Sequence, residues 1–430
     1  FLVENVWTKN YEGIRIVNRF LEKIDELKMP VKPTTSGTNE ELVRTRERMK
    51  GEAHFLRAYF YFELIKRYGG VPLITKSLTV EEAQQVTRAS YDDCMKQIIA
   101  DCDTAANRLP EQYKGSSESV GFDDKKELGR PTTGSAYGLK SRALLYWASP
   151  LNNPNNDKQR YKLAIDAAQK VVESAFRYKL MAFTEEDETF TDLYAVSENF
   201  LQYHREIVFS TKYNTTTSVE SQNSPLTMGG KGLTNPTQNL ADAFGMANGK
   251  GINEPGSGYD KDHPYVGRDP RFYMTFAYDG STFTVNDKTQ TIETFEGGKD
   301  ATATNKTATK TGYYLKKLLS PQAVWDGRTN NITRTWILMR YAEVLLNCAE
   351  AMNEYYDVPS AAPKDSIYKV VELVRKRAQL NPYKLPVGLS KEEMREVIRN
   401  ERRVELAFEE HRFFDIRRWR LLDNPTEKTN

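Results

Sequence analysis

The stretch GEAHFLRAYFYFELIKRYGGVPL, residues 51–73, decides the fold class. It belongs to a longer helical pattern over 40–67, which ends at Gly69-Gly70 before Pro72, a typical helix stop. The aromatic side chains that surround this helix are Phe55, Tyr59, Phe60, Tyr61 and Phe62. Because a helix that is apolar on all sides is usually buried between neighbours, the stretch predicts a core helix inside a larger helical array.

Helical periodicity recurs on both sides of this stretch. The further predicted helices are 12–27, 91–108, 134–148, 158–174, 336–356, 365–379 and 390–410. In the first, Ile16, Phe20, Ile24 and Leu27 form the expected apolar stripe. Ser90 is the expected N-cap of 91–108. Helices that follow one another in pairs are typical of solenoids. We therefore predict a mostly α protein built as a TPR-like helix-pair solenoid, in which 134–148 and 158–174 form one repeat unit.

The middle of the chain has a different composition. Residues 176–335 are rich in Gly, Thr, Asn and Asp, and they contain strand-like runs at 206–210 and 272–276. Such a segment is too long to be a loop, so it is expected to be a large irregular insertion rich in loops and short strands. Within it, 297–312 is expected to be an exposed, mobile loop. The predicted parts are 1–175, 176–335 and 336–430, integrated into one structural unit.

Composition excludes several classes of protein. The 430 residues carry 61 basic and 59 acidic side chains, a net charge of +2 that gives no reason to expect a nucleic-acid partner. The cysteines, expected to be small buried apolar side chains, are Cys94, Cys102 and Cys348. The four histidines lie at no metal-binding spacing, and neither a metal site nor a cofactor is predicted. The Asn-rich turn 152–157 could bind calcium, but a turn explains it without an ion.

Six ordered motifs resemble the SusD/RagB family. They are 51–62 with 68–73, 144–153, 236–240 with 242–244, 268–272, 340–346 with 349–351, and 401–409 with 411–419. The resemblance implies a SusD-like, TPR-like helical fold and a lipid-anchored protein on the extracellular face of the outer membrane. It also implies a partner, a SusC-like TonB-dependent β-barrel, and a ligand, usually a glycan and in some relatives a peptide. Family members usually extend further at both ends and carry an N-terminal lipidated Cys, so we expect residues beyond both ends of this sequence.

The motifs contain many charged side chains, for which we expect a structural role. These are Glu52, Arg57, Arg340, Glu343, Glu401, Arg402, Arg403, Glu405, Arg412, Asp415 and Arg417. Glu409 with His411, or Glu405 with Asp415, could instead form an acid–base pair. A structural ion-pair network is favoured, because Glu401 and Glu405 share a helix face with arginines at helical spacing. No catalytic residue is predicted.

Candidate ligand-binding residues lie in the insertion. Sugars bind aromatic faces flanked by amide, carboxylate and basic groups. The residues that fit this description outside the core helices are Tyr213, Asn223, Lys231, Asn235, Tyr259, Tyr265 and Trp325. Taken singly, each of these aromatics is more often a packed loop anchor than a sugar-binding face. The sequence therefore favours a non-catalytic glycan-capture protein. The alternatives are a peptide-binding RagB-like variant, a glycan hydrolase that uses paired carboxylates, and a TPR scaffold that binds only proteins.

Overall fold

The computed structural model describes residues 3–26, 39–113, 127, 129–174, 178–182, 193, 205–212, 214–325 and 332–423. These residues form two compact units. The first unit lies within Phe1–Phe176 and adds Phe414–Asp423, and the second unit lies within Arg177–Phe413.

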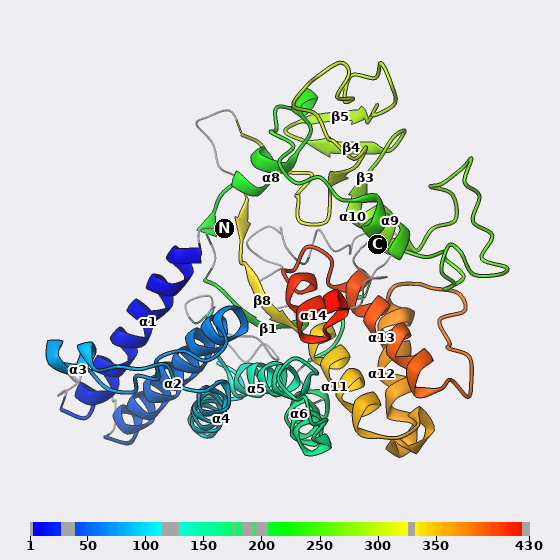
Figure 1. Ribbon diagram of the computed structural model, residues 1–430. Coiled ribbons are helices and arrows are strands. Elements are labelled where there is room, and N and C mark those ends of the chain that lie inside the picture. Colours follow the sequence, from blue (N-terminus) through cyan, green and yellow to red (C-terminus); the bar gives the residue numbers. More distant parts are fainter. Residues whose placement is uncertain are drawn as a thin grey trace. The chain divides into compact units, whose positions relative to one another are not determined.

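The first unit is an array of helices (Figure 1). Its helices are α1 (Val3–Lys23), α2 (Asn39–Tyr68), α3 (Val80–Gln84), α4 (Tyr91–Arg108), α5 (Thr133–Ala148) and α6 (Lys158–Val172). The end of α14 (Arg412–Arg418) and the 3₁₀ turn η6 (Leu421–Asp423) complete the unit. Successive long helices pack in the order α1–α2, α2–α4, α4–α5 and α5–α6, an arrangement consistent with a TPR-like solenoid.

Local signals place α2, α4, α5 and α6 close to their predicted bounds, whereas α1 begins at Val3 instead of at residue 12 and α3 was not predicted. The α4 helix spans the predicted 91–108, and the Ser90 hydroxyl accepts a 3.0 Å hydrogen bond from the backbone N–H of Asp93, as the N-cap assignment requires. The α2 helix confirms the predicted core, because Phe55, Tyr61 and Phe62 are buried. On the same helix, Tyr59 and Phe60 are only half-buried. All three cysteines are buried, as predicted.

The predicted apolar stripe of α1 is wrong at Ile16 and is confirmed at Ile24, and its member Phe20 is half-buried. Ile14, Val17 and Ile24 are buried, whereas Ile16 is 68% exposed. The reason is the face that α1 turns toward α2: a Cβ atom at Gly13 would lie 2.5 Å from the Phe60 ring. The buried face therefore runs through 13, 14, 17 and 24 instead of through 16. The fourth predicted member, Leu27, lies outside the described residues.

The second unit combines short strands with helices. Its strands are β1 (Ile207–Ser210), β2 (Asn214–Thr215), β3 (Phe276–Ala277), β4 (Thr282–Val285), β5 (Lys288–Thr291), β6 (Tyr314–Leu315), β7 (Thr333–Arg334) and β8 (Ile337–Arg340). The described strands form two-stranded antiparallel pairs, β1–β8, β2–β7, β3–β6 and β4–β5. The strand predicted at 206–210 is confirmed as β1. This unit has the irregular, short-strand content expected of the insertion.

The helices of the second unit fall into short and long ones. The short helical elements are α8 (Ser218–Asn223), η3 (Leu226–Met228), α9 (Gln238–Ala243), α10 (Pro270–Thr275), η4 (Pro359–Ala361) and η5 (Pro363–Asp365). The long ones are α11 (Tyr341–Tyr355), α12 (Ser366–Arg377) and α13 (Lys391–Glu405). All three long helices pack against one another, as Figure 1 shows in yellow to red. With the first unit they make the protein mostly helical, as predicted.

Two predicted elements have the wrong type or start. The helix predicted from 336 begins at Tyr341, because 337–340 form β8 and pair with β1. Residues 272–275 of the strand predicted at 272–276 belong to the helix α10, and only Phe276 is in a strand, β3. Asp269 caps this helix by accepting a 2.9 Å hydrogen bond from the Arg271 N–H. Pro270 occupies the first helical position, where its fixed φ and missing N–H favour a helix start.

The loop 297–312 is less exposed than predicted. Ala301, Ala308 and Thr309 are buried, and so is the carboxylate of Asp300. This carboxylate accepts hydrogen bonds from the Thr227 hydroxyl at 2.5 Å and from the Glu293 N–H at 3.0 Å. A buried carboxylate needs such partners, and together they tie the loop to the rest of the second unit.

Candidate functional site

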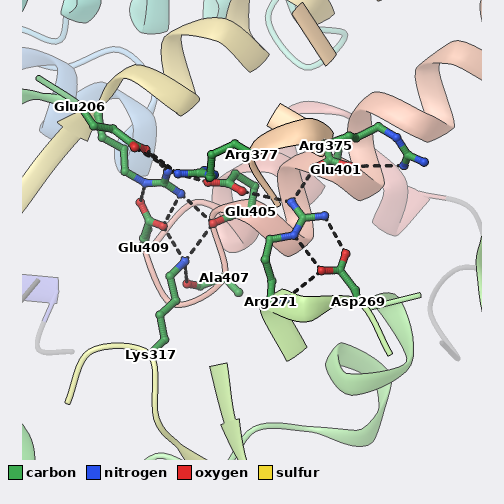
Figure 2. Close-up of polar contacts among 11 residues, drawn as sticks. Glu206, Asp269, Arg271, Lys317, Arg375, Arg377, Glu401, Glu405, Ala407 and Glu409 are labelled. Carbon is green, nitrogen blue, oxygen red and sulfur yellow. Dashed lines mark hydrogen bonds and ion pairs between the residues drawn. The ribbon is translucent and has the colours of Figure 1, made fainter. Parts of the chain in front are cut away.

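The first candidate site is the cluster of acidic and basic side chains in the second unit. Figure 2 shows Glu405 in the middle of this cluster, at the last residue of α13. Its side chain is fully buried. One carboxylate oxygen accepts hydrogen bonds from Arg340, at 2.6 Å, and from Arg377, and the other accepts one from Arg271 at 3.1 Å. Glu405 is thus held by three guanidinium groups.

The network continues to both sides of Glu405. Arg271 also donates to Glu401 at 2.5 Å and to Asp269 at 2.7 Å, and Glu401 lies 3.8 Å from Arg375 (Figure 2). On the other side, Glu206 accepts from Arg340 at 2.7 Å. Because Glu206 precedes β1 and Arg340 ends β8, this ion pair joins the ends of the paired strands.

A buried lysine closes the network. The Nζ atom of Lys317 donates to the carbonyl oxygens of Glu405 and Ala407, at 2.9 and 3.0 Å, and to the Glu409 carboxylate at 2.7 Å. Burial lowers the pKa of Lys317 to about 8. Burial alone would raise the pKa of Glu409, but Arg340 and Lys317 outweigh it and lower that pKa to about 2. Glu409 is therefore an ionised partner and is not a proton donor at neutral pH.

The charges of the network balance. Its cations are Arg271, Lys317, Arg340, Arg375 and Arg377, and its carboxylates are Glu206, Asp269, Glu401, Glu405 and Glu409. Each carboxylate is buried or nearly so and faces at least one cation. A general acid or base must reach a substrate, so this arrangement favours a structural role over the acid–base alternatives.

Other charged residues of the motifs also pair within their own units. In the first unit, Arg57 donates to Asp101 at 2.7 and 2.8 Å, and Glu52 accepts from Arg130 at 2.8 Å. At the chain's far end, Asp415 accepts from Arg418 at 2.8 Å.

The remaining motif residues lie on the helices α11, α13 and α14. Arg402 donates to Asn347 at 2.6 Å, and Glu343 lies 3.7 Å from His411. Arg403 donates to the carbonyl oxygen of Asn239 at 2.9 Å. Two further members differ in exposure: Arg412 is exposed and Arg417 is half-buried. Contacts of this kind suit side chains that hold loops to helices, and we keep a structural role for the whole set as a proposal.

Two predicted ligand-binding amides are already used inside the fold. Asn223 donates to the Val219 carbonyl at 2.7 Å and accepts from the Thr234 hydroxyl at 2.6 Å. Asn235 donates to the Gly232 carbonyl at 2.8 Å and accepts from the Lys310 N–H at 3.1 Å. These bonds engage each amide once as a donor and once as an acceptor within the loop.

One of the predicted tyrosines, Tyr265, lies in an aromatic cluster. Tyr265 stacks on Phe272, with ring centroids 6.1 Å apart, and tilts against Tyr278 at 4.4 Å. Tyr259 lies under the guanidinium of Arg268, 5.5 Å from its ring centroid. Tyr278 is half-buried and was missed by sequence reasoning, which had no signal to separate it from other aromatics. The last predicted tyrosine, Tyr213, lies outside the described residues.

Trp325 is the predicted residue whose setting best fits a sugar-binding face. Its ring is half-buried, and its indole N–H donates to the Gly229 carbonyl at 3.1 Å. Its backbone N–H donates to the Asn286 side chain at 2.9 Å. The exposed Lys231 follows Gly229 by two residues, and the exposed Asp287 follows Asn286 in the β4–β5 turn. We call these five residues the Trp325 surface.

In the Trp325 surface the indole ring makes one hydrogen bond and the Trp325 backbone makes the other. The Asn286 amide is also used inside the fold, since it donates to the Met228 carbonyl at 3.4 Å. The exposed Lys231 and Asp287 lie close in sequence to the two residues that accept these bonds. Fixed aromatic faces with convergent polar groups are suited to carbohydrate. Sequence reasoning missed Asn286 and Asp287, although Asn-Asp between alternating residues is a hairpin-turn signal.

The described residues show no grouping that suggests other chemistry. They contain no group of three or more His, Cys, Asp or Glu side chains placed to hold a metal ion. None of the helices within these ranges is both long and apolar enough to cross a bilayer. The Asn-rich turn uses its amides internally, since Asn153 donates to the Ala148 carbonyl at 3.0 Å and accepts from the Asp157 N–H at 2.9 Å.

The first unit is thus an array of paired helices, and the second unit combines short strands, helices and a buried ion network in a mostly helical protein. Comparison with known sequences then identifies the family. Residues 200–430 match the SusD family, and residues 2–145 match a family described as starch-binding and associating with the outer membrane. The chain belongs to the SusD family.

Individual relatives agree with this assignment. A SusD-like protein from Bacteroides fragilis is 31% identical, with a TM-score of 0.73 over 97% of this chain and 75% of that one. A SusD-like carbohydrate-binding protein from the same organism is 25% identical, with a TM-score of 0.75 over 97% and 73%. SusD-like protein P2 of Formosa agariphila is 25% identical over 86% of this chain. The match spans 65% of that relative's length.

Proposed function

We propose that this protein is a non-catalytic nutrient-capture protein that binds glycans at the cell surface. The observation that carries the proposal is the match to a family described as starch-binding and associating with the outer membrane. A relative that is 25% identical is itself described as carbohydrate-binding. In the chain's own residues, the Trp325 surface supplies the aromatic and polar groups that such a ligand needs.

The ligand-binding role belongs, in this proposal, to the insertion at 176–335, and above all to the Trp325 surface. One face of the indole covers the apolar C–H patch of a sugar ring, and the side chains of Lys231 and Asp287 bond to its hydroxyl groups. Loops on a rigid helical scaffold are a common place for binding residues. The glycan is held but not cleaved, because the carboxylates of the central network are paired with arginines and are withdrawn from solvent.

The proposal also includes a membrane partner and a location. The protein is anchored by an N-terminal lipid on the extracellular face of the outer membrane and hands its glycan to a SusC-like TonB-dependent β-barrel. The family's described association with the outer membrane supports this part. Purification of the full-length protein from outer membranes tests it: a β-barrel of transporter size should co-purify. Recovery of the protein alone, under conditions that preserve other membrane complexes, would contradict it.

Calorimetry tests the binding surface. The protein is titrated with soluble starch and with neutral oligosaccharides, as wild type and as the variants Trp325→Ala and Trp336→Ala. Trp336 is the matched control, because it is a half-buried tryptophan of the same unit that packs in another hydrophobic cluster. We expect Trp325→Ala to weaken binding at least tenfold, about 1.4 kcal/mol, and Trp336→Ala to leave it unchanged. Equal affinities of the two variants for the saccharide would show that the Trp325 surface is not the binding site.

A further inference from the structure

The second unit carries another aromatic surface, which the proposed function does not use. Tyr265 and Tyr278 are both half-buried, so part of each side chain is in contact with solvent. Their ring centroids lie 4.4 Å apart, and their planes are tilted by 39°. Two rings at this distance form one continuous aromatic surface that is wider than a single side chain provides.

Both rings are held in place within the fold. Each packs on the buried Phe272, whose ring centroid lies 6.1 Å from that of Tyr265 and 5.4 Å from that of Tyr278. The hydroxyl of Tyr273 donates to the Tyr265 carbonyl at 2.7 Å. The Ser281 hydroxyl accepts from the backbone N–H of Tyr278 at 2.9 Å and donates to its carbonyl at 2.6 Å. Side chains fixed in this way lose little conformational freedom when a ligand binds, which favours affinity.

Hydrogen-bonding groups lie beside these rings. Within the described ranges the hydrogen bonds of Tyr278 come from its backbone, so its phenol hydroxyl has no partner there. Tyr313 packs edge-on against Tyr265, with ring centroids 6.2 Å apart, and its hydroxyl donates to the exposed Gln238 at 3.0 Å. Gln238 in turn donates to the Asp242 carboxylate at 2.7 Å. We call Gln238, Asp242, Tyr265 and Tyr278 the Tyr278 surface.

The Tyr278 surface and the Trp325 surface rest on the same pair of strands. In the β3–β6 pair, Ala277 lies opposite Tyr314, and both belong to the hydrophobic cluster against which Trp325 packs. The flanking residues Tyr278 and Tyr313 pack instead in the cluster of the Tyr278 surface. Because successive residues of a strand face opposite sides, one two-stranded ladder supports both surfaces.

The two surfaces lie within reach of one extended ligand. The Asn286 side chain accepts a hydrogen bond from the backbone N–H of Trp325 at 2.9 Å, and Tyr278 precedes Asn286 by eight residues. A fully extended chain of this length spans at most about 29 Å, which limits the distance between Tyr278 and Asn286. A long glycan can therefore contact both surfaces at once, as two linked binding events.

We propose that the Tyr278 surface is a second sugar-binding surface, which holds a further part of the glycan chain that Trp325 binds. Its rings cover the apolar C–H patch of a sugar, while the Tyr278 hydroxyl, the Gln238 amide and the Asp242 carboxylate bond to the sugar hydroxyls. The ligand class is therefore a long glycan chain, because two linked contacts raise its affinity above that of a short oligosaccharide. The inference rests on the proposed function, since it takes the Trp325 surface as the first contact.

The test uses a long probe, a short probe and the whole protein. Soluble starch and maltose are each titrated by calorimetry into the wild type and into the variants Tyr278→Ala, Gln238→Ala, Trp325→Ala and Tyr383→Ala. Gln238 is exposed, so its replacement leaves the aromatic rings in place. Tyr383 is the matched control, because it is a half-buried tyrosine of the same unit with different neighbours. Its ring centroid lies 5.6 Å from the Nζ atom of Lys376 and 5.4 Å from that of Lys384.

We expect the wild type to bind starch more tightly than maltose, and Tyr278→Ala to weaken starch binding roughly tenfold while maltose binding at the Trp325 surface stays unchanged. Gln238→Ala should weaken starch binding roughly threefold, and Tyr383→Ala should change neither affinity. Starch binding that neither Tyr278→Ala nor Gln238→Ala weakens would overturn the proposal. An equal loss for both probes in Tyr278→Ala would also overturn it, since the ring would then support the fold and not a second contact.

Failure of this inference differs from failure of the proposed function. Starch binding that Trp325→Ala weakens and Tyr278→Ala does not would end only the second surface. A wild type that binds neither starch nor maltose would overturn the second surface as well, whereas the proposed function fails only if every other glycan is also left unbound.

Discussion

Replacement of Glu405 by Gln tests the balance of the buried network. The carboxylate accepts hydrogen bonds from three arginines, and its side chain is fully buried. Gln keeps the shape but removes the charge and points an N–H donor toward guanidinium donors. Five buried cations would then face four carboxylates. Removal of one partner from a buried ion pair costs about 3–5 kcal/mol, so the equilibrium constant for opening the second unit should rise roughly 10²–10⁴-fold.

The matched control for this variant is Glu396→Gln. Glu396 lies on the same helix, α13, pairs with Arg399 at 3.0 Å and is 71% exposed. Exposed pairs contribute about 0–1 kcal/mol, so this change should have little effect.

Hydrogen exchange, read by mass spectrometry, measures the local free energy of opening in each unit separately. In Glu405→Gln, peptides from α11, α12 and α13 should lose protection, while peptides from α4 and α5 in the first unit should keep theirs. If Glu405→Gln lowers protection no more than Glu396→Gln does, the network does not hold the second unit together and the reasoning is refuted.

Three further predictions follow from single contacts. The pKa of Glu409 is lowered to about 2, so its contribution to the unfolding free energy is complete above pH 4.5 and is lost as the pH falls toward 2. Urea unfolding followed by circular dichroism should show that the second unit loses roughly 3 kcal/mol of unfolding free energy between these two pH values. An unfolding free energy that stays constant over this range would contradict the prediction. Asp101→Asn leaves the buried Arg57 without its carboxylate and should cost roughly 3 kcal/mol in urea unfolding, so a loss below about 1 kcal/mol would argue against that ion pair. Gly70→Ala places a Cβ atom 2.1 Å from the backbone oxygen of Ala89 and should lower the melting temperature, whereas an unchanged melting temperature would show that the backbone moves aside freely.

Much of the helical part could be predicted from the sequence because its signals are local. The α4 helix has the bounds expected from Ser90 and its own periodicity, and α12 and α13 lie within one to five residues of theirs. The strand β8 could not be predicted from its own residues. An apolar run of four fits a helix or a strand equally well, and the partner that decides it, β1, lies about 130 residues earlier.

The error at α10 has a different cause, because the decisive signal was present and local. Aromatic content at 272–276 favours a strand, but Asp269 followed by Pro270 is a helix-start signal that outweighs it. The register error in α1 is again a matter of tertiary contact, since Gly13 and Phe60 determine which face is buried.

The same distinction applies to the candidate sites. A shared helix face predicted that Glu401 and Glu405 take part in ion pairs, but their partners come from distant segments. Arg271 lies 130 residues before Glu401, and no local pattern connects the two. Trp325 could be chosen from the sequence as a candidate ligand-binding residue because of its residue type. Its hydrogen bonds to Gly229 and Asn286 could not be predicted, because they depend on loops that meet only in the folded chain.

The central claim is that the protein binds glycans without converting them. The most direct measurement is calorimetry of the purified protein with soluble polysaccharides, oligosaccharides and a peptide mixture, followed by mass spectrometry of the same samples after prolonged incubation. We expect saturable binding of at least one glycan, no binding of peptides and recovery of every glycan intact. Cleavage of a bound glycan would contradict the non-catalytic role, and saturable binding of peptides alone would contradict the glycan assignment.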